Sequence, residues 1–455
     1  QYRPGRPAGR RGYNIMSSST IAIIITFITM ILFFSNKIAM SVVSCAAALA
    51  MGILIPEMKL SQIYSGFGGS TVVMVAGMCI VGDALFQTGV AQKLGAKIAA
   101  TPLAKNERVF IMSVVIICTL MSAFLSNSGT IAMWMPIIAS IAAGSNGKIR
   151  SKMVIFPAGI ACIIGGGCTL VGSVSQPVVN GVLMGTAGFE EGFGVFEMTK
   201  IMGPVAIVQV IFWGTIGYTL LEKVLKPGSP DFDKNNAFAN PELLSTEDKE
   251  NVPAWKGTVS LVVMAACIVL FIASGYKPFK SYFNIANIAM LGSVVLFLTG
   301  CVPVKKALRD LPWDILICIG AVTAIGTGLD VSGGAVIADT VLNMFGGANA
   351  SVVVLTVVIC VLSSVLTLFL QNSTVAALMS PIVISMALTM GISPVPWCVV
   401  LAIGTNLAIA TPIGTAVNMQ ILPAGYTWKD FGLIGGPLFL ITVVLVSILA
   451  CVVYF

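Results

Sequence analysis

The feature that most limits how this chain can fold is a series of long apolar runs without charge. One of them is VFIMSVVIICTLMSAF, Val109–Phe124. A helix needs about 20 apolar residues to cross ~30 Å of hydrocarbon, and several runs reach that length. Only 9% of the 455 residues are charged, whereas soluble domains average roughly 25%. The sequence lacks alternating apolar and polar strands, so we predict an all-α polytopic membrane protein rather than a barrel.

A polar triplet interrupts two of these runs in the same way. The first lies in LSNSGTIAMWMPI (Leu125–Ile137), and the second lies 245 residues later in LQNSTVAALMSPI (Leu370–Ile382). Two further pairs match at nearly the same offset: VGDALFQTGVA (81–91) with IGTGLDVSGGA (325–335), and TLVGS (169–173) with TPIGT (411–415). A near-constant offset predicts a transporter built from two repeats.

We divide the chain at its one long polar segment. Residues 16–225 form the first repeat, residues 257–455 form the second, and residues 226–256 form a linker too polar to lie in lipid. Residues 1–15, rich in Arg, Pro and Gly, precede Met16 and are interpreted as a vector-derived remnant or a disordered basic arm.

Each repeat is expected to contain about five transmembrane helices plus one two-armed segment, at 108–143 and 350–390. Because five is an odd number, the second repeat must run inverted relative to the first. The distribution of positive charge agrees with a cytoplasmic linker and with both termini outside. On that assignment the outer side holds four lysines besides residues 1–15, and the inner side holds most of the others, such as Lys37, Lys105, Arg150 and Lys306.

The two-armed segments have two possible arrangements. Either both arms cross the membrane, or they form a re-entrant hairpin with its tip near the middle. The arm at 129–143 has about 15 residues, or ~22 Å of helix, which is short for a crossing and favours the hairpin. The tips would then be Ser126–Asn127–Ser128 and Gln371–Asn372–Ser373.

A second symmetric feature is a pair of segments rich in Gly, Pro, Ser and Thr, at 165–177 and 409–418. Such residues within a span predict an unwound stretch, which is tolerated where it lines a cavity. Helix ends at the tips and breaks would present N–H groups to an anion and carbonyls to a cation. Polar residues in membrane helices also serve as packing contacts, but two symmetric copies favour a binding site.

The residues that are missing narrow the chemistry further. The chain has no His, and no Lys or Arg lies in the middle of a span, while Asp83, Asp314 and Asp330 are expected near span ends. An anion site without a fixed cation needs helix dipoles and co-bound cations, which predicts cation-coupled anion uptake. Without a nucleophile and base or a metal site, we do not expect an enzyme.

At these residues the chain resembles the divalent anion/sodium symporter (DASS, SLC13-like) family of the ion transporter superfamily. That family has two Ser-Asn-Thr triplets, here SNS and QNS, and Gly-Thr-Pro-rich unwound segments, here TLVGSVSQP and ATPIGT. The resemblance implies a homodimer of elevator type that carries C4-dicarboxylates, citrate or sulfate. It implies substrate binding by Ser126, Asn127, Ser128, Gln371, Asn372, Ser373, Thr411 and Pro412. It implies sodium binding by Ser122, Ser126, Asn127, Gly172, Thr367, Leu370, Asn372 and Ala410.

The sequence departs from the family pattern at both tips. Ser128 and Ser373 stand where the family has Thr, and Gln371 replaces the first Ser of the second triplet. The 31-residue linker is too short for the regulatory insert of sulfate-type permeases, which favours carboxylates. We therefore expect a sodium-coupled importer of a C4-dicarboxylate or citrate in a bacterial inner membrane, with no cofactor and no nucleic-acid partner. A sodium-independent exchanger or a sulfate or oxyanion permease is the alternative.

Overall fold

The computed structural model describes residues 16–90 except 36, 106–233, 236–239, 252–274, 283–332, 342, 343, 347 and 350–455. All regular elements in this part of the chain are helices, which confirms the predicted all-α class. The segment 1–15 lies outside the described residues, and so do residues 234, 235 and 240–251 of the predicted linker.

The helices follow the predicted apolar runs. Those of the first half are α1 (Ser18–Ser35), α2 (Met40–Leu54), α3 (Leu60–Ser65), α4 (Ser70–Gln87), α6 (Glu107–Ser122), α7 (Asn127–Gly144), α8 (Ser151–Gly166), α9 (Ser175–Met184), α10 (Thr199–Gly214) and α11 (Ile216–Leu225), with the short 3₁₀ turn η1 (Gly66–Gly68) after α3.

The second half repeats this order of long, broken and paired helices. Its elements are α12 (Ala254–Ala273), α14 (Ile285–Leu298), α15 (Val304–Asp310), α16 (Trp313–Ser332), α18 (Val352–Leu366), α19 (Asn372–Thr389), α20 (Val395–Gly404), α21 (Ala416–Ile421), η5 (Leu422–Ala424), α22 (Trp428–Asp430), η6 (Phe431–Gly435) and α23 (Gly436–Tyr454).

Several helices are long and apolar enough to cross a membrane. Among the described residues, four meet that length and composition: Leu60–Gln87, Ala254–Ala273, Asn372–Thr389 and Trp428–Tyr454. Two further pairs qualify if each bent pair is one span: α10 with α11, bent by 50°, and α15 with α16, bent by 60°. Further apolar helices of the described residues are shorter, with 10–17 residues each.

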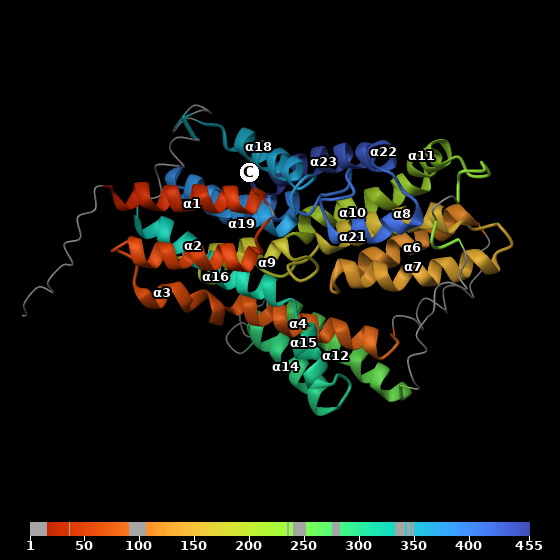
Figure 1. The fold of residues 1–455 in the computed structure, drawn as a ribbon, viewed down its shortest axis with the longest axis horizontal. Coiled ribbons are helices and arrows are strands. Elements are labelled where there is room, and N and C mark those ends of the chain that lie inside the picture. The colour runs from red at the N-terminus through yellow and green to blue at the C-terminus, as the bar shows by residue number, and fades with distance from the viewer. Residues whose placement is uncertain are drawn as a thin grey trace, which may run out of the picture.

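The two halves of the sequence are interleaved rather than side by side. Helix α2 packs along α16 and α4 packs along α14, so elements of the first half pair with elements of the second (Figure 1). Within the first half, α6 packs on α8. A Cβ at Gly165 of α8 would lie 2.3 Å from the Thr119 carbonyl oxygen of α6, so only glycine permits this approach. Small residues at such crossings are typical of membrane helices.

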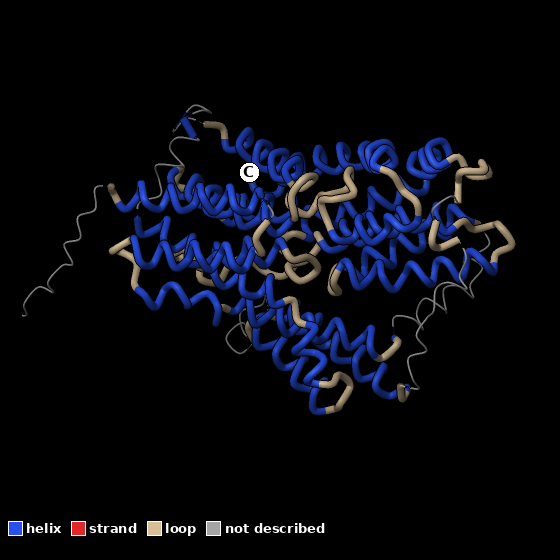
Figure 2. Tube along the Cα trace, viewed as in Figure 1, coloured by secondary structure: helices blue, strands red, loops and turns tan. Residues whose placement is uncertain are grey.

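Both predicted unwound segments contain a break in the helix, although each also includes helical residues. The chain leaves its helical path between α8 and α9, at residues 167–174, and between α20 and α21, at residues 405–415. The second break starts four residues before the predicted segment, because α20 ends at Gly404. Figure 2 shows these loops gathered near the middle of the molecule, surrounded by helices. The two helical pairs α6–α7 and α18–α19 turn back at 123–126 and 367–371.

Candidate anion and cation site

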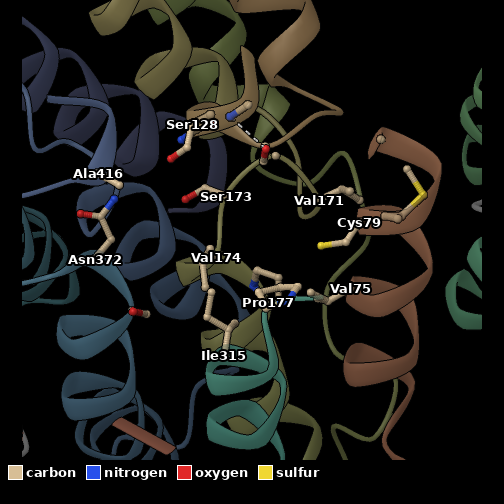
Figure 3. Close-up of a pocket in the computed structure, with 18 of the residues that line it drawn as sticks. Val75, Cys79, Ser128, Val171, Ser173, Val174, Pro177, Ile315, Asn372 and Ala416 are labelled. Atoms are coloured by element: carbon tan, nitrogen blue, oxygen red, sulfur yellow. Dashed lines mark hydrogen bonds between the residues drawn. The ribbon is translucent and has the colours of Figure 1, made fainter. Parts of the chain in front are cut away.

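A cavity of about 630 Å³ lies where the two turns, the two breaks and α4 meet. Both predicted tips line it: Ser126, Asn127, Ser128, Gln371, Asn372 and Ser373 are all wall residues. Figure 3 shows Ser128, Ser173, Asn372 and Ala416 on one side of this space and Val75 and Cys79 of α4 on the other. The cavity therefore brings together residues separated by about half the chain.

The first tip is organised around Asn127, the first residue of α7. One end of its side-chain amide faces three oxygens: Ser122 Oγ at 2.6 Å, the Gly172 carbonyl at 2.9 Å and the Cys162 carbonyl at 3.1 Å. With its nitrogen turned toward them, the amide donates to the carbonyls. With its oxygen turned toward them, only the Ser122 hydroxyl donates, at 2.6 Å, and the oxygens together form a ligand set for a cation.

The second tip repeats this arrangement at Asn372, the first residue of α19. Its amide faces Thr367 Oγ1 at 2.7 Å, the Gly414 carbonyl at 3.0 Å and the Thr405 carbonyl at 3.2 Å. The Thr367 hydroxyl also donates to the Thr405 carbonyl at 2.7 Å. Both asparagines thus join a hairpin tip to the adjacent break through one hydroxyl and two main-chain carbonyls.

Matching threonines tie each break to its tip. The Thr169 hydroxyl donates to the Ala123 carbonyl, and the Thr411 hydroxyl donates to the Leu368 carbonyl. These carbonyls lie at the ends of α6 and α18, where helix geometry leaves them without a main-chain donor. The bonds therefore compensate for the helix end and hold the tip against the break.

Matching amides also bridge each break. Gln176 Nε2 donates to the Gly166 carbonyl at 3.2 Å, across the first break. Asn418 Nδ2 donates to the carbonyls of Ala408 at 2.6 Å and Thr411 at 2.7 Å, across the second. Gln176 and Asn418 are 242 residues apart, as are Thr169 and Thr411. The same hydrogen bonds thus recur at the offset that the sequence motifs have.

Two predicted substrate residues lie away from the cavity wall. Thr411 and Pro412 are not among its lining residues, and Thr411 instead holds the Leu368 carbonyl. The break reaches the cavity further along, through Gly414, Thr415 and Ala416, as the first break does through Gly172, Ser173 and Val174. The offset of 242 between TLVGS and TPIGT is the signal that identifies these positions.

Some of the predicted cation-binding residues lie in the two oxygen clusters and others do not. Ser122, Asn127 and Gly172 form one oxygen cluster, and Thr367 and Asn372 belong to the other. The prediction omitted the carbonyls of Cys162, Thr405 and Gly414. The Ser126 side chain accepts from the Gly129 N–H at 3.2 Å and caps α7. The predicted residue Leu370 donates its N–H to Leu366 at 3.0 Å, and Ala410 lies beside Gly435.

The remaining wall of the cavity is largely apolar but contains three aspartates. Asp83 of α4, Asp310 of α15 and Asp314 of α16 line it, while none of the described lining residues is a lysine or arginine. Asp83 accepts from Gln87, and Asp314 accepts from the N–H of Ser41 at 3.2 Å. Asp83 and Asp314 do lie toward their helix ends, as expected, but sequence reasoning did not place them at the site.

The ligand atoms available at the site indicate which kind of metal ion it could bind. Within the described part of the chain, no group of three or more His, Cys, Asp and Glu side chains can hold a metal ion. The two clusters at the tips consist of hydroxyl, amide and carbonyl oxygens, which suit a hard cation with oxygen ligands.

The two tips differ at one position, which leads to a stability prediction. Ser126 and Gln371 have nearly the same backbone conformation, φ −62° and −63°, but only Ser126 caps its helix with its side chain. We expect Gln371→Ser to stabilise the protein by about 1 kcal/mol, because serine supplies the missing acceptor. Ser126→Gln should destabilise it similarly. Thermal unfolding in detergent measures both, and a Gln371→Ser variant that melts lower would contradict the assignment.

An all-helical membrane protein with two hairpin tips and two interrupted helices around one cavity has the architecture of a secondary transporter. A sequence model of the citrate transporter family (CitMHS) matches residues 30–397 and 336–455 of the chain. These ranges cover most of the sequence, and the chain belongs to this family. It is an integral membrane transporter and not an enzyme.

Curated relatives agree with this class. The sodium-dependent dicarboxylate transporter SdcS of Staphylococcus saprophyticus is 24% identical over 434 residues, 89% of this chain and 79% of that protein. The uncharacterized transporter YfbS of Escherichia coli is 33% identical over 138 residues, 30% of this chain and 22% of that protein. Sodium/sulfate cotransporter 1 of Chlamydomonas reinhardtii is 25% identical over 181 residues, 39% of this chain and 20% of that protein. The matches thus span most of SdcS but less than a quarter of the other two.

Two solved structures share the fold. MtrF of Neisseria gonorrhoeae, described as one of a class of antimetabolite efflux pumps, has a TM-score of 0.60 at 14% identity over 97% of this chain and 96% of that chain. The YdaH transporter of Alcanivorax borkumensis, described as having an unusual topology, has a TM-score of 0.59 at 13% identity over 96% and 98% of the two chains. At these identities the likeness concerns the fold.

Proposed function

We propose that this protein imports a small divalent anion, a C4-dicarboxylate or citrate, together with sodium. The observation that carries the proposal is the pair of matching oxygen clusters at Asn127 and Asn372, which flank one cavity shared by both hairpin tips. SdcS, with which the chain aligns over most of its length, is a sodium-dependent dicarboxylate transporter.

Each cluster offers a site for one sodium ion. The amide oxygen of Asn127, the Ser122 hydroxyl and the carbonyls of Gly172 and Cys162 surround the first position. At the second, Asn372, Thr367, Gly414 and Thr405 supply the equivalent atoms. Without a bound ion, each amide would point its nitrogen at the carbonyls. With a sodium ion bound, each amide would point its oxygen at the ion. Interrupted helices provide such carbonyls for coupling ions in other transporters.

The anion would lie between the tips. Helices α7 and α19 both begin there, and the positive ends of their dipoles favour negative charge. The hydroxyls of Ser128, Ser173, Ser373 and Thr415 are at the same wall. A cavity of about 630 Å³ is large enough for a di- or tricarboxylate, and an anion with two carboxylates can contact both tips at once. This size and geometry support a carboxylate over sulfate.

The charges at the cavity support a requirement for sodium. An anion entering alone would meet the carboxylate of Asp314, which repels it, and would find no lysine or arginine among the described lining residues, while Asp310 is paired with Arg309 at 2.9 Å. Cations bound at the two clusters would offset that repulsion. Sodium would therefore bind first, and the anion second.

Transport would follow an elevator mechanism in a homodimer. The tips and the broken helices would move across the membrane with the bound anion, against the fixed helices around α4, α14 and α16. The linker would be cytoplasmic, with both termini outside, in a bacterial inner membrane, as the positive charges and the family resemblance suggest.

Reconstituted transport tests the proposal. We expect proteoliposomes to accumulate labelled succinate or citrate when sodium is outside, and at least about tenfold less when choline replaces it, since each absent ion removes a favourable coupling term. Unchanged uptake without sodium would refute the symport and favour the alternative, a sodium-independent exchanger. Uptake of sulfate but not of carboxylates would indicate the second alternative, an oxyanion permease like the sodium/sulfate relatives.

A further inference from the structure

The first part of the linker is built into both halves of the molecule. Residues 226–233 and 236–239 follow α11, and their side chains Phe232, Asn236 and Phe238 are buried. A linker that served only to connect the repeats would be solvated. Burial of these residues therefore calls for a structural role of the segment.

Lys152 anchors this segment to the first half. It is the second residue of α8 and is only 6% exposed, which is rare for a lysine. Its Nζ donates to the Phe232 carbonyl of the linker at 2.9 Å and lies 5.6 Å from the Phe232 ring centre. Burial disfavours its positive charge, and the carboxylates of Asp430 and Asp233 partly offset that penalty.

The same lysine is joined to the second half. The Tyr426 hydroxyl, from the turn after η5, donates to the Lys152 main-chain carbonyl. The Tyr426 ring centre lies 5.9 Å from Lys152 Nζ and 5.2 Å from the ring centre of Phe156 of α8. Lys152 thus lies between the linker on one side and the segment after the second broken helix on the other.

Asn236 and Ala237 complete the connection. Asn236 Nδ2 donates to Ser151 Oγ at 3.3 Å, at the start of α8. The next residue, Ala237, donates its N–H to the Pro423 carbonyl of η5 at 2.9 Å. Two consecutive linker residues therefore bind the start of α8 and the η5 turn that follows α21. We call residues 226–233 and 236–239, with Lys152 and Tyr426, the linker bridge.

The two cation sites and the anion site differ in how they depend on the two halves of the chain. The oxygen cluster at Asn127 uses residues of the first half alone, and the cluster at Asn372 uses residues of the second half alone. The proposed anion position lies between the two tips and depends on their separation. Asn406 also joins the halves beside the second cluster, since its amide donates to the Ile163 carbonyl of α8 at 2.5 Å. Because the ligand oxygens of each cation cluster come from one half, a device that sets the relative position of α8 and α21 acts chiefly on the anion site.

We propose that the linker bridge holds the two broken helices in register, so that both tips face the anion at the correct distance, with Lys152 and Asn236 as positioning residues. The proposal rests on the proposed anion site between the tips. It assigns the linker a role in substrate affinity, in addition to connecting the repeats.

The full-length protein tests this with two variants. Asn236→Ala removes the amide that donates to Ser151 and Asp233 and accepts from the Phe238 N–H. Lys152→Met removes the buried ammonium while keeping the length of the side chain. We expect each to raise the Kd for succinate or citrate about fivefold or more, as for the loss of a coupled contact. The concentration of sodium that half-saturates thermal stabilisation without anion should stay within about twofold of wild type, because each cation cluster is complete in its own half.

Lys148→Met is the matched control, since Lys148 is exposed and lies four residues before Lys152. It should leave both affinities unchanged. A parallel loss of anion and sodium affinity in Asn236→Ala would indicate general destabilisation and would overturn the positioning role. Unchanged anion affinity in both bridge variants would overturn it as well.

A measurement independent of transport separates this proposal from the proposed function. Spin labels on unnatural amino acids at 148 and 429, which spare the eleven native cysteines, report the distance between the two halves. We expect a narrow distribution in wild type and a broader one in Asn236→Ala. If wild-type protein binds no anion in the presence of sodium, the proposed function is wrong. The label distances still test the linker bridge, because distance distributions of equal width in wild type and Asn236→Ala would refute it.

Discussion

Replacing Asn127 or Asn372 with alanine should reduce sodium-dependent uptake about 100-fold or more. Each amide contacts one hydroxyl and two main-chain carbonyls within 3.2 Å. Removing it takes the donor from the Gly172 or Gly414 carbonyl, at about 1–3 kcal/mol for each buried group, and tenfold in affinity corresponds to 1.4 kcal/mol. Thr367 and Thr405 keep their bond to each other. Initial uptake rates of labelled dicarboxylate over a range of sodium concentrations measure the loss.

The effect should appear mainly as a weaker response to sodium. A suitable control is Asn146→Gly, because Asn146 is exposed and has φ 53°, a conformation that glycine adopts freely. That variant should transport like wild type. If Asn127→Ala and Asn372→Ala both retain normal sodium dependence while folding normally, the two clusters are not the cation sites.

Gly172→Ala and Gly414→Ala should each lower uptake by a similar factor, for a steric reason. A Cβ at Gly172 would lie 2.6 Å from the Ser122 carbonyl oxygen, and one at Gly414 would lie 2.4 Å from the Thr367 carbonyl oxygen. Because these neighbours are main-chain atoms, the break must move, and its carbonyl moves away from the asparagine. A misplacement of about 1 Å can cost roughly 100-fold in rate.

Gly144→Ala provides the comparison, since a Cβ at the end of α7 meets no atom within 4 Å. Uptake by this variant should be normal. Detergent-solubilised Gly172→Ala and Gly414→Ala should elute as intact protein in gel filtration, so that lost transport is not confused with lost folding. Wild-type uptake by both variants would mean that the carbonyls of the breaks do not bind the transported ions.

Much of the fold could be predicted because membrane helices are specified locally. A long apolar run must be helical in lipid, since its main-chain groups have no other partners there. The turns at Ser126 and Gln371 and the break near Gly172 were likewise visible as polar or glycine-rich interruptions. The all-helical class and the family are confirmed; the inverted orientation and the elevator movement stay predictions.

The sequence by itself determined which helices exist, where the tips lie and that the pattern occurs twice, because these depend on local polarity and on an internal comparison. Only the tertiary structure decided which oxygens meet Asn127 and Asn372. The carbonyls of Cys162 and Thr405 belong to main-chain groups that any residue could supply, so their side chains carry no signal. Asp83 and Asp314 face the cavity because α4 and α16 pack beside it, and such packing between distant segments is not encoded in any local pattern.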